Sequence, residues 1–223
     1  MAFYVYSPNW FSGIDSLLEI TVILISIVIS YYSLKVYKYF NINKYKYFAF
    51  TFVLFALSFI SKIISNLIFI VPTKREITSG VFYVFYTTYQ KLDYIEDISF
   101  FIHKLSLLTS FLILFLIITK ENKIETILTF ILYVIILSFL INNYFLFNIV
   151  IITNSILLFL INYNKDSNNN KNSGLTLFFL IFSISHILFF LAVQHSIFYF
   201  LGEVMLISSF IILLFDLIKT FQK

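Results

Sequence analysis

The chain has 223 residues, of which 61% are hydrophobic, 21% aromatic and only 12% charged. A soluble domain carries about 25% charged residues, so this composition excludes both a soluble globular fold and a disordered chain. The net charge of +4 comes from scattered lysines, which excludes a nucleic-acid surface, and there is no cysteine for a disulfide or a thiolate metal site. We therefore expect residues 1–223 to form a single polytopic membrane domain.

Seven apolar stretches are long enough to cross the hydrocarbon core of a membrane as helices, which takes about 20 residues each. They cover residues 14–34, 47–71, 98–119, 124–141, 144–161, 175–193 and 197–218. The turns at 142–143 and 194–196 are so short that the helices they join must be antiparallel neighbours. The sequence therefore predicts an all-α fold, a bundle of seven transmembrane helices.

Two connections in this scheme are long. Residues 162–174 are polar and low in complexity, which predicts a flexible loop. Residues 72–97 contain the aromatic run 82–86, followed by three acidic residues. We interpret this segment either as an interfacial helix or hairpin with its rings at headgroup level, or as a lid over an outward-facing pocket.

The basic residues predict how the bundle is oriented, because cytoplasmic loops carry an excess of Lys and Arg. With the N-terminus outside, the inner loops and tail hold ten of the 15 basic residues, and the outer segments hold only Lys74, Arg75 and Lys91. We expect the N-terminus outside, the C-terminus inside and a multi-pass location in the cell membrane.

Ionisable groups inside a membrane span are costly, so each needs a partner or a purpose. Five of them fall at similar depth in the outer half of the predicted bundle, on five different helices: Glu19, Lys62, His103, His186 and Glu203. Asn66 continues the polar stripe of Lys62 on its helix, one turn further on. The inner half contains only Asp216, near its end.

These residues allow two interpretations. A charge in mid-membrane costs at least about 2.5–3.5 kcal/mol, so Lys62 is expected to pair with Glu19 or Glu203, and packing alone would account for that pair. The other interpretation is an outward-facing polar pocket that binds a small ligand, a lipid headgroup or an ion. Its predicted lining is Glu19, Lys62, Asn66, His103, His186 and Glu203. The one-sided placement favours this pocket, because packing contacts serve equally well at any depth.

Residue spacing tests two specific chemistries. A retinal protein needs a lysine in the middle of the seventh helix, and Lys219 lies at its inner edge, so a rhodopsin is excluded. Seven-helix zinc hydrolases place an HxxxH pair on the last helix, which contains no His here. A metal held by His103, His186 and Glu203 stays open as an alternative, and we expect no organic cofactor.

The last two predicted helices contain the segments 185–190 (SHILFF) and 198–203 (FYFLGE), followed by an apolar run to Asp216. These segments resemble the end of seven-helix membrane-associated sensor domains, which precede histidine kinases and diguanylate cyclases in bacteria and archaea. A His commonly follows the glycine in those domains, where this chain has Glu203. The resemblance implies a stand-alone prokaryotic sensor-like module, without kinase or cyclase output, that signals through a partner.

The predicted function is therefore the binding of a ligand or partner through the outward-facing pocket, without catalysis. One alternative is a metal-assisted intramembrane hydrolase acting on a lipid. The other is an accessory subunit of a membrane complex. The expected partners are the lipid bilayer and a membrane or cytoplasmic protein, with no nucleic acid.

Overall fold

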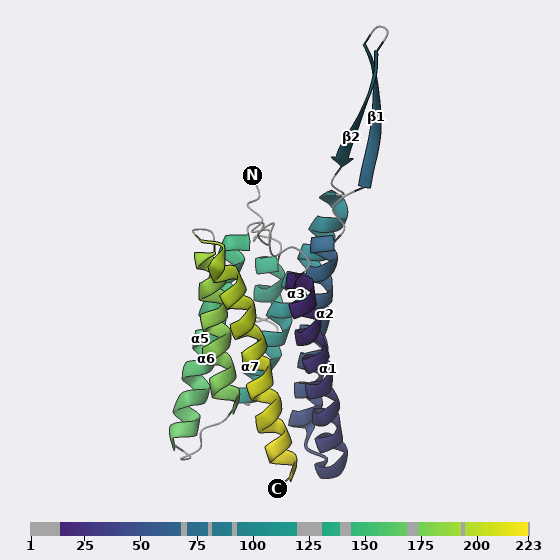
Figure 1. Cartoon of the computed structure of the whole chain (residues 1–223). Coiled ribbons are helices and arrows are strands. Elements are labelled where there is room, and N and C mark those ends of the chain that lie inside the picture. The colour runs from purple at the N-terminus through teal and green to yellow at the C-terminus, as the bar shows by residue number, and fades with distance from the viewer. Residues whose placement is uncertain are drawn as a thin grey trace.

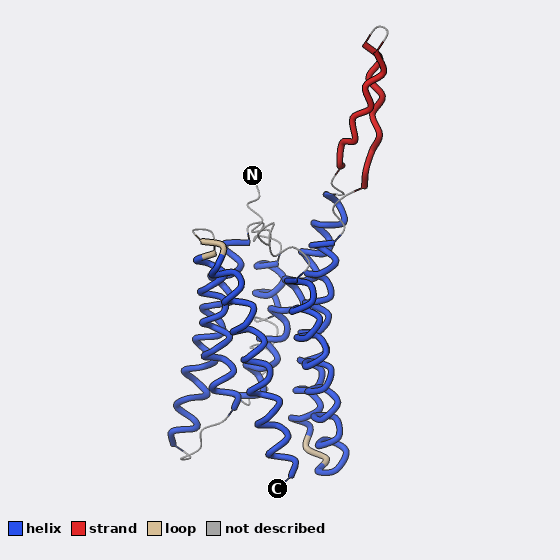
Figure 2. The backbone as a smooth tube through the Cα atoms, viewed as in Figure 1, coloured by secondary structure: helices blue, strands red, loops and turns tan. Residues whose placement is uncertain are grey.

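A computed structural model (Figures 1 and 2) describes the backbone of residues 14–67, 71–79, 82–90, 93–119, 131–138, 144–168, 174–192 and 195–222. Side chains are described for residues 14–65, 97–119, 131–138, 146–166, 174–192 and 195–219.

Six described helices are long and apolar enough to cross a membrane. They are α1 (Ile14–Phe40), α2 (Asn43–Leu67), α3 (Asp93–Thr119), α5 (Tyr144–Asn168), α6 (Gly174–Leu191) and α7 (Ile197–Gln222). Figure 1 shows them side by side in one bundle. The predicted helical, membrane-type fold is thereby confirmed. Of the predicted fourth span, residues 131–138 are helical and the remainder lies outside the described residues.

The bundle is a closed ring of helices. Helices that follow one another in the chain pack together in the pairs α1–α2, α2–α3, α5–α6 and α6–α7. Two further contacts close the ring, because α3 packs against α5 and α7 packs against α1. This closure brings the first and last helices together, although they lie at opposite ends of the sequence.

The centre of the ring is filled by phenylalanine. Phe55 is completely buried, and its ring makes edge contacts with those of Phe111, Phe178 and Phe210 at centroid separations of 5.5–6.3 Å. Aromatic pairs prefer this geometry. The outward faces carry large exposed apolar side chains such as Leu24, which is 58% exposed. An apolar interior surrounded by an apolar exterior is typical of a bundle whose solvent is lipid.

Most serines inside the helices are satisfied locally. Ser26, Ser33, Ser61 and Ser138 each donate a hydrogen bond to the carbonyl four residues earlier, at 2.7–2.9 Å. A hydroxyl bonded in this way needs neither water nor a second helix. Most serine hydroxyls in the helices therefore have their hydrogen bonds within their own helix. The regions of the interior differ instead in their ionisable side chains.

The segment between α2 and α3 is a β-hairpin, one of the forms expected for it. Strand β1 (Val71–Ser79) pairs antiparallel with β2 (Phe82–Gln90), from Val71 opposite Gln90 to Ser79 opposite Phe82. The sequence of β2, FYVFYTTYQ, is rich in aromatic and β-branched residues, which favour strands. In Figure 2 the hairpin points away from the bundle and does not cover it. Among the residues that the structure describes, the fold is thus helical apart from this one hairpin.

The loop predicted at 162–174 begins later than expected, because α5 continues to Asn168. The side-chain amide of Asn162 donates to Asp166 one turn further on, at 3.3 Å, and to the hydroxyl of Thr176 on α6, at 2.6 Å. These contacts hold the polar end of α5 against α6, and local composition alone does not reveal them.

Candidate functional site

The strongest cluster of charges lies near the end of the bundle that carries the hairpin, which we call the hairpin end. The ammonium Nζ of Lys62 is 2.6 Å from Oε1 of Glu19 and 3.1 Å from Oε1 of Glu203. The three residues, which we call the ion centre, come from α2, α1 and α7 respectively. The prediction that Lys62 pairs with one of these carboxylates is confirmed, and the structure shows that both take part.

The ion centre is enclosed by protein. Glu19 and Glu203 are 0% exposed and Lys62 is 8% exposed. Oε2 of Glu19 and Oε2 of Glu203 are both buried, and neither accepts a hydrogen bond from a residue that the structure describes. Buried charges are stable only when they are paired and hydrogen-bonded, so these two carboxylate oxygens are the least satisfied polar atoms of the centre.

Helix geometry brings the three residues to one level. Glu19 lies five residues after the start of α1, Lys62 five residues before the end of α2, and Glu203 six residues after the start of α7. At 1.5 Å per residue each is about 8 Å from the hairpin end of its helix. Closure of the ring places α7 beside α1, so the two carboxylates meet the same lysine.

A glycine makes room for this arrangement. A Cβ added to Gly202 would lie 2.8 Å from the ring of Phe189 on α6 and 3.2 Å from the carbonyl oxygen of Ser185. The bare backbone of α7 therefore lets the Phe189 ring pack directly against it. That ring is centred 5.3 Å from Nζ of Lys62, a separation at which an aromatic face attracts a cation.

Two further residues belong to this region, although they were not among the predicted site residues. Asp15 is 2% exposed and lies within electrostatic range of Glu19 and Glu203. The ring of Tyr199 is centred 5.9 Å from Nζ of Lys62. The spacing of Asp15, one turn before Glu19 on the same helix face, was the signal that could have identified it.

The two predicted site histidines in the spans have partners of their own. Nδ1 of His103 lies 2.8 Å from the hydroxyl oxygen of Ser58 on α2. Nδ1 of His186 lies 2.8 Å from Oδ1 of Asn148 on α5, which accepts its hydrogen. Both imidazoles are buried and lie within electrostatic range of Lys62. They belong to the same region as the ion centre and have hydrogen-bond partners of their own.

The six predicted site residues therefore divide into three groups. Glu19, Lys62 and Glu203 are in direct contact, and His103 and His186 are nearby on separate hydrogen bonds. The side chain of Asn66 lies outside the described residues. Their joint role in binding a ligand stays a prediction.

The three residues of the alternative metal site, His103, His186 and Glu203, do not form a metal-binding cluster in the described structure. Within the described part of the chain, no three side chains of the His, Asp or Glu type come close enough together to share a metal ion.

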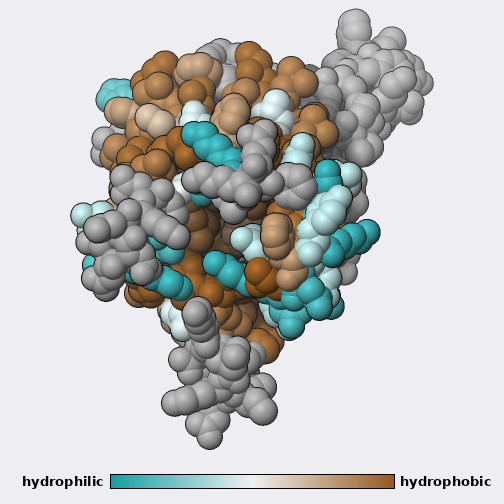
Figure 3. Space-filling view, turned by 90° about the horizontal axis from the view of Figure 1, so that it is seen from below, coloured by the Kyte–Doolittle hydropathy of each residue, from teal (hydrophilic) through white to brown (hydrophobic). Residues whose placement is uncertain are grey.

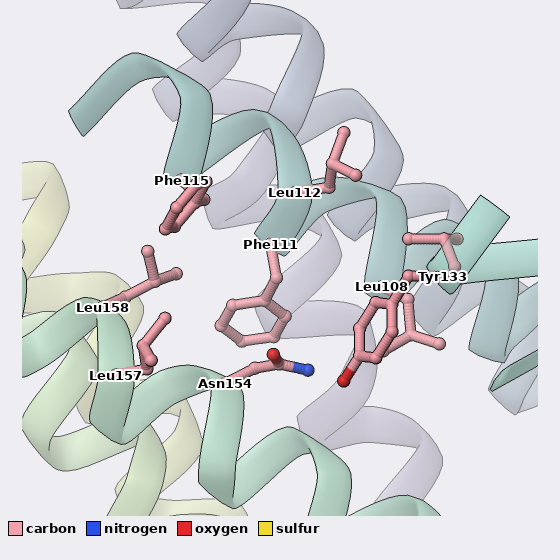
Figure 4. Close-up of a pocket in the computed structure, with 9 residues that line it drawn as sticks. Leu108, Phe111, Leu112, Phe115, Tyr133, Asn154, Leu157 and Leu158 are labelled. Carbon is pink, nitrogen blue, oxygen red and sulfur yellow. The ribbon is translucent and has the colours of Figure 1, made fainter. Parts of the chain in front are cut away.

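Two cavities in the described structure lie away from the ion centre. One, of about 40 Å³, is lined by α3, the helical segment 131–138 and α5, and its lining is apolar apart from Asn154 and Tyr133 (Figure 4). It has room for little more than a water molecule. The other, of about 220 Å³, is lined by both charged and apolar side chains and lies at the opposite end of the bundle.

Comparisons of this chain with family models, with curated proteins and with solved structures find no match. The resemblance of segments 185–190 and 198–203 to sensor domains stays a hypothesis drawn from the residues themselves.

Proposed function

We propose that this protein is a seven-helix integral membrane protein of the cell membrane that binds a ligand in a sensor-like way, without catalysis. Its N-terminus lies outside and its C-terminus inside, so the ion centre lies toward the outer surface. The six apolar helices support the membrane location. The excess of lysines in the loops of the opposite end supports the orientation.

The observation that carries the binding role is the imbalance of charge around Lys62. Two buried carboxylates, of Glu19 and Glu203, share the single ammonium of Lys62. Net charge buried in apolar surroundings is costly. A proton or the cationic group of a ligand would balance it, and the rings of Phe189 and Tyr199 add faces that attract cations.

Binding of a cation would act on the arrangement of the helices. Lys62 connects α2 to both α1 and α7. A cation that takes over one carboxylate removes one of these two connections, so the helix that carries this carboxylate is no longer tied to α2 by an ion pair. The ligand shifts the equilibrium between the helix arrangements with and without that ion pair, to the extent that it binds one arrangement more tightly than the other. A sensor has this property.

The experiment measures the separation of α1 and α7 in nanodiscs with spin labels on Leu17→Cys and Leu201→Cys, whose native side chains are exposed. The probes are ammonium, methylammonium and sodium at constant ionic strength. We expect at least one of them to shift the distance distribution, because it competes with Lys62. A Glu19→Gln/Glu203→Gln protein should not respond.

The matched control is Asp97→Asn, which removes an exposed carboxylate outside the ion centre and should leave the response unchanged. A distribution that none of the three cations moves would contradict the proposal. So would an equal response in the Glu19→Gln/Glu203→Gln protein.

For signalling we propose a membrane or cytoplasmic protein partner, with the bilayer as the surrounding medium and no nucleic acid. This part rests on the resemblance of segments 185–190 and 198–203 to sensor domains. Co-purification from native membranes tests it. A partner that is released when the cation probe is added supports the sensor, whereas one that stays bound in a constant ratio favours the accessory-subunit alternative.

A further inference from the structure

A second polar region lies at the end of the bundle opposite the hairpin. The cavity of about 220 Å³ is bounded there by the first turns of α2 and α6 and the last turns of α3, α5 and α7. Figure 3 looks onto this end and shows hydrophilic side chains around a hollow with hydrophobic atoms inside it. Phe48, Leu213 and Leu217 form a buried apolar floor. The residues of the ion centre do not line this cavity, so the two regions are distinct.

One wall of the cavity is acidic and faces the start of α6. Oδ2 of Asp216 accepts a hydrogen bond from the backbone nitrogen of Gly174 at 3.0 Å. Oδ2 of Asp166 accepts one from the hydroxyl of Thr176. A Cβ added to Gly174 would lie 2.3 Å from Cβ of Asp216, so α6 and α7 are in close contact here. These bonds hold both carboxylates at the α6 side.

The other wall is basic and lies toward the end of α3. Nζ of Lys165 donates a hydrogen bond to the carbonyl oxygen of Ile118 at 3.1 Å. The antiparallel helices α2 and α3 are aligned by the bond from the Ser110 hydroxyl to the carbonyl of Thr51. Lys44 lies about two turns before Thr51 on α2, and Ile118 lies about two turns after Ser110 on α3. Because the two helices are antiparallel, Lys44 and Ile118 both lie roughly 10–12 Å from the Ser110–Thr51 hydrogen bond, in the same direction along the bundle. Lys44 and Lys165 therefore lie near the same helix end.

Charges of opposite sign on separate walls match a zwitterion better than a net ion, because two lysines and two aspartates leave the rim neutral. Lysine is a common phosphate binder, and carboxylates pair with ammonium groups. The volume is below the roughly 300–1,000 Å³ of sites for drug-sized ligands, so it suits a small group. We propose that this cavity binds a zwitterionic aminoalkyl phosphate, with its phosphate at Lys44 and Lys165 and its ammonium at Asp166 and Asp216.

This group has two possible sources, which the experiment separates. The first arm measures lipid retained by the purified protein in native mass spectrometry, with phosphatidylethanolamine, phosphatidylglycerol and phosphatidylcholine supplied in equal amounts. The second arm titrates soluble phosphoethanolamine into the protein in phosphatidylcholine nanodiscs by calorimetry. The first probe tests a lipid headgroup, and the second a free metabolite.

We expect one of the two probes to bind selectively and to lose roughly tenfold or more in affinity or retention in Lys44→Gln/Lys165→Gln, because charge-assisted bonds are lost. Lys46→Gln is the matched control, since Lys46 is an exposed lysine two residues from Lys44 that does not line the cavity. If removal of the Lys165 contact to α3 unfolds the double variant, Lys44→Gln alone provides the test.

Two results would overturn the proposal. The first is equal retention of the three lipids together with no heat from phosphoethanolamine. The second is binding that Lys44→Gln and Lys46→Gln weaken equally, which would indicate a diffuse attraction to surface lysines rather than this cavity.

Discussion

Lys62 shares its ammonium between two buried carboxylates, which makes it the residue that joins three helices in the hairpin half of the bundle. Its neighbours show why such a charge is tolerated. Glu19 and Glu203 neutralise it, and the Phe189 ring replaces part of its hydration. Removing the lysine would leave two carboxylates facing each other in a site closed to water.

Replacement of this lysine is the sharpest test at the residue scale. We expect Lys62→Met to lower the free energy of unfolding by about 3–5 kcal/mol, because it leaves uncompensated buried charge. Adding Glu19→Gln and Glu203→Gln should restore a large part of that loss, since none of the three residues of the ion centre then carries a charge. Thermal unfolding in nanodiscs measures both effects.

Lys38→Met, which changes an exposed lysine on α1, is the control and should change stability by less than about 0.5 kcal/mol. A Lys62→Met protein as stable as this control would show that the ion pairs contribute nothing to the fold.

Gly202 gives a second prediction at this scale. We expect Gly202→Ala to destabilise the protein by about 1–3 kcal/mol, because its Cβ would lie 2.8 Å from the Phe189 ring. Combining it with Phe189→Leu should recover part of the loss by vacating that space. The unfolding temperatures of the single and double variants measure this, and additive losses would argue against the contact.

At the scale of elements, the helices and the hairpin have different origins. Each helix is long and apolar, and in lipid such a segment forms all its backbone hydrogen bonds within itself, independently of its neighbours. The hairpin forms where the second strand is rich in aromatic and β-branched residues, which favour strands, and its strands pair only with each other in the described structure.

The register of the hairpin can be tested by disulfide formation, because the chain contains no cysteine of its own. Thr73 lies directly opposite Thr88, and directly opposed residues have Cβ atoms about 4.5–5.5 Å apart. We expect Thr73→Cys/Thr88→Cys to form an intramolecular disulfide on mild oxidation, as measured by a gel shift. Thr73→Cys/Thr87→Cys, offset by one residue, should react far more slowly, and equal rates would contradict this register.

At the scale of the whole molecule, closure of the ring decides which residues meet. Because α7 packs against α1, Glu19 and Glu203 come together at the ion centre, although they lie 184 positions apart in the sequence. The two ends of the bundle also differ chemically. The hairpin end holds an enclosed cluster with excess acid, and the opposite end holds a cavity with a balanced rim.

Orientation is the prediction that belongs to this scale. We expect a single cysteine at His195, which is exposed at the hairpin end, to react with an impermeant maleimide on intact cells. A single cysteine at Lys46, exposed at the opposite end, should react only after the membrane is permeabilised. The opposite pattern would place the N-terminus inside, and labelling of both sites on intact cells would contradict a membrane-spanning bundle.

The sequence by itself determined the helical segments, because the length and hydropathy of a span are local properties set by the thickness of the hydrocarbon core. It also determined that Lys62 needs a carboxylate, since the cost of a buried charge does not depend on the rest of the fold.

Only the tertiary structure decided that Glu19 and Glu203 both take that role, and that Lys44 and Asp216 line one cavity. Beyond helices joined by short turns, which helices become neighbours depends on tertiary contacts, as where α7 packs against α1 and both meet Lys62. In lipid, where no hydrophobic force drives helices together, such packing selects the neighbours, and it involves residues far apart in the chain that local patterns cannot relate.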